Sequence, residues 1–187
     1  WIQLDYRGSR GWSNGRLFSI RTQTVAAPTT PQATPTPAPA APVPAPKPAP
    51  GGKYIALTFD DGPSAHTPRL LDALRANNAK ATFFVIGSLV GGRESTLRRM
   101  VNEGHEIGNH TYGHPDLRRL SRSGVSSQIT STDNRIRNVT GVTPRLMRPP
   151  YGSRNNTVMS VAGSTGKAVI LWSVDTNDWR YRNSSRL

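Results

Sequence analysis

Residues 58–63 read Thr-Phe-Asp-Asp-Gly-Pro, and the rest of this 187-residue chain can be interpreted around them. The stretch completes an apolar run that predicts a buried strand over 54–59. The Gly-Pro pair favours a turn, so Asp60 and Asp61 should lie where this strand becomes a loop. Two adjacent carboxylates repel each other unless a cation, a base or a proton intervenes. An Asp-Gly turn with a spare surface Asp is the ordinary alternative.

Downstream, short apolar runs alternate with longer amphipathic stretches. The patterns predict further strands at 81–86, 106–109, 146–148 and 168–172, and helices at 67–77, 93–102, 121–139 and 155–162. This alternation is typical of an α/β fold with a parallel sheet and right-handed crossovers. The pattern alone does not distinguish an open sheet from a barrel.

Chemically distinctive residues follow four of the predicted strands. They are Asp60 and Asp61 after the first strand, His110 and His114 after the third, Arg148, Pro149, Pro150 and Tyr151 after the fourth, and Asp175, Asp178 and Trp179 after the fifth. The carboxyl ends of parallel strands face the same side of the sheet, where binding sites are built. The sequence therefore predicts one site that combines these clusters.

His110 and His114 are four residues apart, which aligns the two imidazoles if their loop takes a helical turn. Such a pair alone is usually explained by surface histidines or by histidines with satisfied hydrogen bonds. Together with a carboxylate from the first strand end, it makes a set of two His and one Asp that leaves coordination positions for water and substrate. The chain contains no cysteine, so any metal must take His and carboxylate ligands.

The formal net charge is +13, with +4 in residues 1–50 and +9 in residues 51–187. A surface of this sign attracts nucleic acid, anionic lipid headgroups or an anionic cell-wall polymer. No basic stripe interleaved with aromatic residues and no zinc-finger spacing occurs, so we do not expect a nucleic-acid reader. No apolar run approaches the ~20 residues of a membrane helix, so we expect no membrane span. We also expect the protein to be a monomer.

The first 52 residues divide into two predicted parts. Residues 1–22 predict strands on either side of a turn at 7–11, the second opening at Trp12, and their pattern resembles the C-terminal part of a bacterial SH3-like domain. Two or three strands cannot bury a core, so this part should be poorly ordered or weakly docked. Residues 23–52 predict a Pro/Ala/Thr-rich linker, because ten of the 23 residues from 28 to 50 are Pro. At about 3.1 Å per residue its proline-rich part would reach ~70 Å, and a Pro-rich ligand for another domain is the alternative.

Four motifs resemble those of the polysaccharide deacetylase family, the nodulation-type deacetylases of carbohydrate esterase family four. They are Thr-Phe-Asp-Asp-Gly-Pro at 58–63, His-Thr-Tyr-Gly-His-Pro at 110–115, Arg-Pro-Pro-Tyr-Gly at 148–152 and Asp-Thr-Asn-Asp-Trp at 175–179. The similarity covers about residues 53–180. It implies that residues 53–187 are a catalytic domain with a distorted, incomplete (β/α) barrel.

The resemblance also implies roles for individual residues. Asp61, His110 and His114 would bind a divalent metal, usually zinc. Asp60 would be the catalytic base, and Arg148 would orient it. The metal would activate water for attack on an acetamide.

Other implied roles concern the substrate. Pro150, Tyr151 and Trp179 would contact it, with the Tyr151 main-chain N–H facing the oxyanion and Trp179 lining the acetyl pocket. The family's last motif, Leu-x-His, carries the general acid and does not occur before Leu187. Asp178 would hold that histidine, with Asp175 as a competitor. We therefore expect the parent protein to be an enzyme, and residues 1–187 alone to bind metal weakly and turn over poorly.

The function implied by the resemblance is hydrolysis of N-acetyl groups on an amino-sugar polymer such as peptidoglycan or chitin. O-acetyl xylan esterase activity at the same site and a catalytically silent glycan-binding module are the alternatives. The linker, the SH3-like pattern and the basic charge predict a secreted or cell-wall-associated protein. Residues 163–167, Gly-Ser-Thr-Gly-Lys, resemble part of a phosphate-binding loop, but the first glycine of that pattern would fall at Val161. The only Gly-x-Ser-x-Gly pattern, at residues 11–15, lies among the predicted N-terminal strands with no helix predicted directly after it, so we do not expect a serine esterase.

Overall fold

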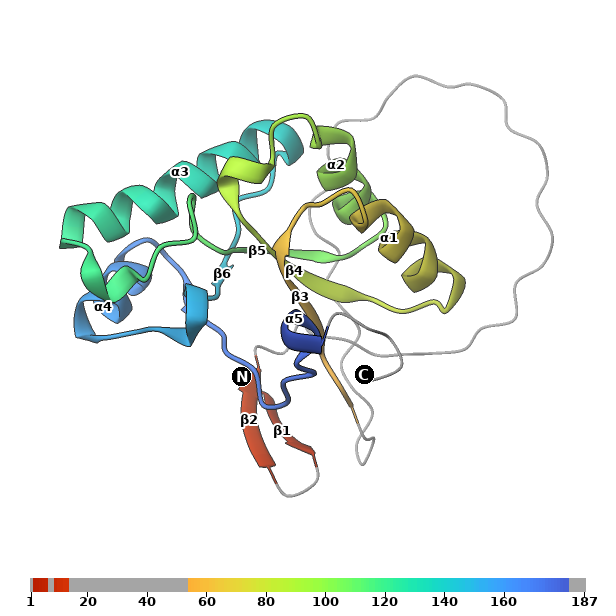
Figure 1. The fold of residues 1–187 in the computed structure, drawn as a ribbon, viewed down its shortest axis with the longest axis horizontal. Coiled ribbons are helices and arrows are strands. Elements are labelled where there is room, and N and C mark those ends of the chain that lie inside the picture. Colours follow the sequence, from red (N-terminus) through yellow and green to blue (C-terminus); the bar gives the residue numbers. More distant parts are fainter. Residues whose placement is uncertain (1, 7–8, 14–53, 182–187) are drawn as a thin grey trace.

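The computed structural model describes residues 2–6, 9–13 and 54–181 (Figure 1). At the N-terminal end, β1 (Ile2–Tyr6) pairs antiparallel with β2 (Ser9–Ser13). The predicted strand pair is confirmed, but its second strand begins at Ser9 instead of Trp12. An SH3-like domain over residues 1–22 and a linker over 23–52 stay predictions, because most of these residues lie outside the described ones.

The remaining strands form a parallel sheet in the order β3-β4-β5-β6-β7, which is also their order in the chain. They are β3 (Leu57–Gly62), β4 (Ala81–Val85), β5 (Glu106–Asn109), β6 (Leu146–Met147) and β7 (Ala168–Val169). β3 and β7 are the two edges of this sheet. The α/β class is therefore confirmed, and within the described residues the barrel is incomplete.

Four helices connect successive strands of the parallel sheet. They are α1 (Thr67–Ala76), α2 (Glu94–Asn102), α3 (Arg122–Thr140) and α4 (Asn156–Ser164), and a short α5 (Asp178–Tyr181) follows β7. Each of the first four contacts the next, so they form a continuous row of helices (Figure 1). None of the helices in the described part of the chain combines the length and the apolar character needed to cross a bilayer.

The helix ends follow from local sequence. The Ser121 hydroxyl accepts a hydrogen bond from the Gly124 N–H and begins α3, and Gly141 ends this helix with φ 72°. The Asn155 side chain accepts from the Val158 N–H in the same way at the start of α4. These caps fix the starts of α3 and α4, and all four predicted helices agree with the observed ones to within two residues.

Two main hydrophobic clusters support the sheet. The larger includes Leu71 of α1, Phe83 of β4 and Leu97 of α2, and all five residues of β4 are buried. The second lies against β6 and includes Ile129 and Met147. Burial of side chains of this size stabilises the fold by about 1.5–3 kcal/mol each relative to full exposure.

The two edge strands differ most from the predictions, and β4 and β6 each end one residue early. β3 begins at Leu57, three residues later than predicted. β3 continues to Gly62, so both aspartates lie within the strand instead of after it. A bulge between Phe59 and Gly62 interrupts the pairing with β4 at these residues. At the other edge, β7 ends at Val169, three residues early, and the carbonyls of Ile170 and Leu171 accept hydrogen bonds from the Arg148 side chain (3.3 and 3.0 Å).

Candidate active site

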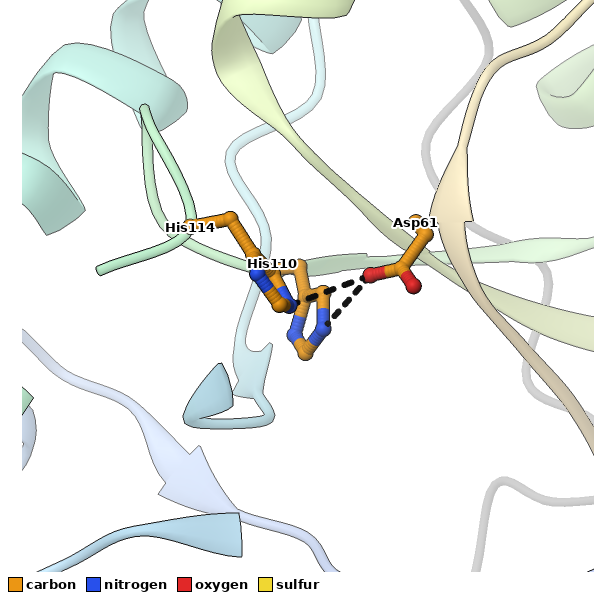
Figure 2. A group of neighbouring side chains, drawn as sticks. All are labelled: Asp61, His110 and His114. Atoms are coloured by element: carbon orange, nitrogen blue, oxygen red, sulfur yellow. Dashed lines mark ion pairs between the residues drawn. The ribbon is translucent and has the colours of Figure 1, made fainter. Parts of the chain in front are cut away.

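Asp61, His110 and His114 form a group whose ligand atoms all lie within 4.8 Å of one another (Figure 2). Asp61 comes from the end of β3, His110 follows β5 directly, and His114 lies on the loop beyond. The Asp61 Oδ1 atom is 3.3 Å from the Nε2 atom of His110 and 3.2 Å from that of His114. The structure therefore brings together the three residues that the sequence analysis assigned to a metal.

The β3 bulge allows the two neighbouring carboxylates to lie in the same site. In a regular strand, adjacent side chains would project from opposite faces of the sheet. Asp61 instead has φ 64°, a left-handed conformation that is uncommon outside glycine. Its carboxylate contacts the two histidines, while that of Asp60 contacts Arg148.

The loop between the two histidines does not take a helical turn. Residues 110–114 form an irregular loop in which Thr111 and His114 have φ 68° and 58°. The His114 N–H donates to the Thr111 hydroxyl oxygen (3.1 Å), and the Thr111 N–H donates to Asn109 Oδ1 (2.8 Å). This loop, and not helical spacing, places the imidazole centroids 5.0 Å apart.

A hydrogen bond at Nδ1, the ring nitrogen that faces away from Asp61, fixes the orientation of His110. Its Nδ1 lies 2.6 Å from the main-chain oxygen of Arg148, and a carbonyl oxygen can only accept a hydrogen bond. Nδ1 therefore carries a proton, and Nε2 is the ring nitrogen that faces Asp61. A hydrogen bond of this kind to the other ring nitrogen typically orients a metal-binding histidine.

The protonation states of this group suit metal ligation. The hydrogen bond with His110 lowers the pKa of Asp61, with further lowering from the nearby imidazoles. Burial lowers the pKa of His114. At neutral pH these shifts favour a carboxylate and a neutral imidazole, which are the forms that bind metal.

The chemistry of the three ligands fits a divalent cation. Two imidazole nitrogens and one carboxylate oxygen are donors that zinc accepts, and three protein ligands are typical of a catalytic site with an open position. The residues thus provide a possible metal site of the predicted composition.

Asp60 and Arg148 form an ion pair beside this group, with Asp60 Oδ1 2.7 Å from Arg148 Nη1. The same guanidinium nitrogen donates to the Thr58 hydroxyl oxygen (2.9 Å). Nε and Nη2 of Arg148 donate to the main-chain oxygens of Ile170 and Leu171, respectively. Arg148 thus joins β3 to the segment after β7 and fixes the position of the Asp60 carboxylate.

Arg148 is only 2% exposed, and aromatic rings surround it. Its guanidinium carbon is 4.2 Å from the centroid of Phe84 and 5.5 Å from that of Trp172. Burial lowers the pKa of Arg148, and the negative charge of Asp60 opposes that shift. A Cβ atom on Gly108, on the adjacent strand β5, would overlap the Phe84 ring. The packing of Phe84 against Arg148 therefore requires glycine at this position.

Tyr151 lies next to the metal-binding group. Its ring is 4.8 Å from that of His114, and its side chain is 68% exposed. Its backbone φ is 60°, within the short turn Pro150–Gly152 that follows β6, and Pro150 is buried there. The Tyr151 main-chain N–H donates to no acceptor within the described part of the chain, so it is available to a substrate oxygen.

Asp178 and Trp179 are on the surface at the start of α5. The Asp178 carboxylate accepts a hydrogen bond from the Thr176 hydroxyl (3.1 Å), and Asp175 accepts from the Asn177 N–H (2.8 Å). Trp179 is 65% exposed. The competition between Asp175 and Asp178, and the acetyl pocket predicted at Trp179, stay predictions.

The sequence analysis missed three residues that support the site: Phe84, Asn109 and Trp172. Phe84 and Trp172 were interpreted only as parts of apolar strands. Asn109 was interpreted only as the last residue of a strand, although it directly precedes His110. An amide at a strand end beside a ligand histidine was the available signal, since such a residue can hydrogen-bond the following loop.

The family model for polysaccharide deacetylases matches residues 47–170 of this chain. The chain belongs to the polysaccharide deacetylase family. The deacetylase domain is 48% identical to the peptidoglycan-N-acetylglucosamine deacetylase of Listeria monocytogenes over 133 residues, which are 71% of this chain and 28% of that protein. The chain thus spans less than a third of that relative's length.

Solved structures agree with this membership. The peptidoglycan deacetylase of Bacillus subtilis is 45% identical, with a TM-score of 0.70, over 74% of this chain and 67% of that one. A family 4 carbohydrate esterase from Streptomyces lividans, in complex with acetate, is 40% identical, with a TM-score of 0.68, over 71% of this chain and 69% of that one. The expected fold of the deacetylase domain is thereby confirmed.

Proposed function

We propose that the deacetylase domain hydrolyses N-acetyl groups on an amino-sugar polymer, with a zinc ion as its metal. The observation that carries this proposal is the metal-binding group of Asp61, His110 and His114 next to the Asp60–Arg148 ion pair. A bound divalent cation would lower the pKa of a coordinated water to roughly 7 and polarise the acetyl carbonyl. The protein residues would then position the substrate and move the proton.

Asp60 is the proposed base. Arg148 holds its Oδ1 atom at 2.7 Å, which leaves the second carboxylate oxygen to accept the proton of the attacking water. The fixed position of the carboxylate matters because the proton must be taken at the moment of attack. Asp61 serves a different role, since its oxygen is turned toward the imidazoles.

Tyr151 is the proposed oxyanion donor. Its left-handed turn places the residue beside His114, and its main-chain N–H would donate to the acetyl oxygen as that atom gains negative charge. The amide C–N bond then breaks, acetate leaves, and the sugar nitrogen takes a proton to become a free amine. We assign that proton to a histidine outside residues 1–187, held by Asp178, with Pro150 and Trp179 contacting the acetylated sugar.

Peptidoglycan is the proposed polymer. The Listeria and Bacillus relatives are peptidoglycan deacetylases by name, and other relatives, at 43–44% identity, are named chitooligosaccharide and chitin deacetylases. All of these names specify an acetylated amino-sugar substrate. The positive charge of the chain would also favour an anionic cell-wall polymer as a partner and a secreted or cell-wall location.

Acetate release by the complete protein tests this function. Peptidoglycan, chitin oligomers and acetylated xylan are incubated with the enzyme, before and after chelation and zinc addition. We expect acetate from peptidoglycan, loss after chelation and recovery with zinc. Acetate from xylan alone would establish the O-acetyl esterase alternative instead.

Asp60→Asn is the matched control for this assay. The substitution keeps the size of the side chain and removes the base, so acetate release should fall roughly 10²–10⁴-fold while zinc still binds. If the unaltered protein binds the polymer but releases no acetate, the chain is a silent glycan-binding module and the proposed function is wrong.

A further inference from the structure

Lys167 is a buried cation whose role the proposed reaction does not explain. It is 7% exposed and lies between α4 and β7, at the end of the glycine-rich stretch that resembles a phosphate loop. Its Nζ atom is 2.6 Å from Asp133 Oδ2 and also donates to the main-chain oxygens of Pro144 (2.7 Å) and Thr165 (3.3 Å). An ammonium has three donors, so Lys167 is fully occupied by protein groups and is not available to a phosphate.

The partner carboxylate connects Lys167 to the metal-binding loop. Asp133, on α3, is 8% exposed, and its other oxygen, Oδ1, accepts from Asn109 Nδ2 at 2.8 Å. Asn109 Nδ2 also donates to the main-chain oxygen of Ile129 (2.8 Å). Both amide protons of Asn109 are therefore bound, which fixes the direction of its oxygen.

That oxygen holds the turn between the two ligand histidines. Asn109 Oδ1 accepts from the Thr111 N–H at 2.8 Å, and Asn109 directly precedes His110. Thr111 is fully buried and has φ 68°, a conformation that β-branched residues rarely adopt. Such a conformation persists only where surrounding contacts enforce it.

We propose that Asn109, held by the buried Asp133–Lys167 ion pair, is a positioning residue of the metal site. It stabilises the left-handed turn at Thr111, through which His114 is placed alongside His110. This inference rests on the proposed metal site. It adds three residues outside the four sequence motifs, and none of the three touches the metal-binding atoms directly.

Removing the ion pair should therefore weaken metal binding from a distance. In Lys167→Met the Asp133 carboxylate would be left buried without a counter-charge and would rearrange toward solvent. Asn109 would lose the acceptor that orients it, and the Thr111 turn would lose its fixed partner. Substitutions of groups behind metal ligands typically cost 10–100-fold in affinity.

Zinc affinity and the visible absorption spectrum of bound Co²⁺ are measured in the complete protein. Asn109→Ala and Lys167→Met should each weaken zinc binding by roughly 10–100-fold and alter the cobalt spectrum. Adding Asp133→Asn to Lys167→Met should recover part of the affinity, because the new amide oxygen can still accept from Asn109 without a buried charge. Leu97→Ala is the stability control, since it truncates a core side chain on α2 and should leave zinc affinity unchanged.

The outcomes separate this inference from the proposed function. If the unaltered protein binds neither zinc nor cobalt, the metal site itself is wrong. If it binds both, and Asn109→Ala and Lys167→Met match it in affinity and spectrum, only the positioning role is overturned. Should Lys167→Met fail to fold, the Asn109→Ala variant and the Lys167→Met/Asp133→Asn double variant carry the test.

Discussion

The half of the sheet formed by β3, β4 and β5 differs from the half formed by β6 and β7 in how its backbone is held. In the first half, strands of four to six residues pack against α1 and α2, and the largest hydrophobic cluster lies there. In the second half, each strand has two residues. There, two buried cations, Arg148 and Lys167, donate to main-chain oxygens around the strands.

The difference teaches where catalytic groups can be placed in this fold. The half with long strands supplies Asp60, Asp61 and the histidines, and the half with short strands supplies Arg148. A buried cation can hold irregular backbone because it satisfies several carbonyl oxygens at once. The second half thus gains stability and a fixed partner for Asp60 from the same side chain.

The largest effect is expected from Asp61→Ala, which separates function from stability. The Asp61 side chain is 64% exposed, so its removal should leave the free energy of unfolding nearly unchanged. Zinc binding and acetate release should both be lost, since two histidines alone make an incomplete ligand set. Calorimetric zinc titration and thermal unfolding check this, and a variant that still binds zinc tightly would contradict the site.

Arg148→Met should affect both properties, which tests the double role of this residue. The variant leaves two carbonyl oxygens and Asp60 without their donor, at a cost of about 3 kcal/mol in the free energy of unfolding. Acetate release should also fall steeply, because Asp60 loses its fixed position. Urea unfolding and acetate assays check this, and unchanged stability would show that the cation does not hold the second half.

Leu97→Ala should lower stability without affecting function, which is the reverse of the effect expected for Asp61→Ala. Leu97 is fully buried in the larger cluster, so its truncation should cost about 2–5 kcal/mol in the free energy of unfolding. Zinc affinity and acetate release per folded molecule should not change. A loss of zinc affinity measured below the unfolding transition would show that the first half is coupled to the site.

The smallest expected effect is the contribution of His105 to the pH dependence of the free energy of unfolding. Burial and the charge of Lys80 lower the pKa of His105, whose Nδ1 accepts a hydrogen bond from the Ala81 N–H. The unfolded chain therefore binds a proton first as the pH falls below 6.5, and stability decreases until the pH reaches the folded-state pKa. His105→Gln should reduce this loss in urea unfolding between pH 6.5 and pH 5, and an unchanged slope would contradict it.

The order of strands and helices could be predicted from the sequence because it depends on local patterns. Apolar runs, helix caps such as Ser121 and the glycine after α3 act within a few residues of each other. The grouping of Asp61, His110 and His114 was also predictable. Parallel strands present their carboxyl ends on one side, so residues placed after strands converge.

The geometry of the site was decided only by the tertiary structure. The bulge that lets Asp60 and Asp61 reach the same site depends on the pairing of β3 with β4, and the left-handed turn at Thr111 depends on Asn109. Lys167 shows the same limit, since its sequence context resembles a phosphate loop, while its partner Asp133 lies 34 positions earlier in the chain. Contacts between residues so far apart leave no local pattern, because the fold alone brings them within hydrogen-bonding distance.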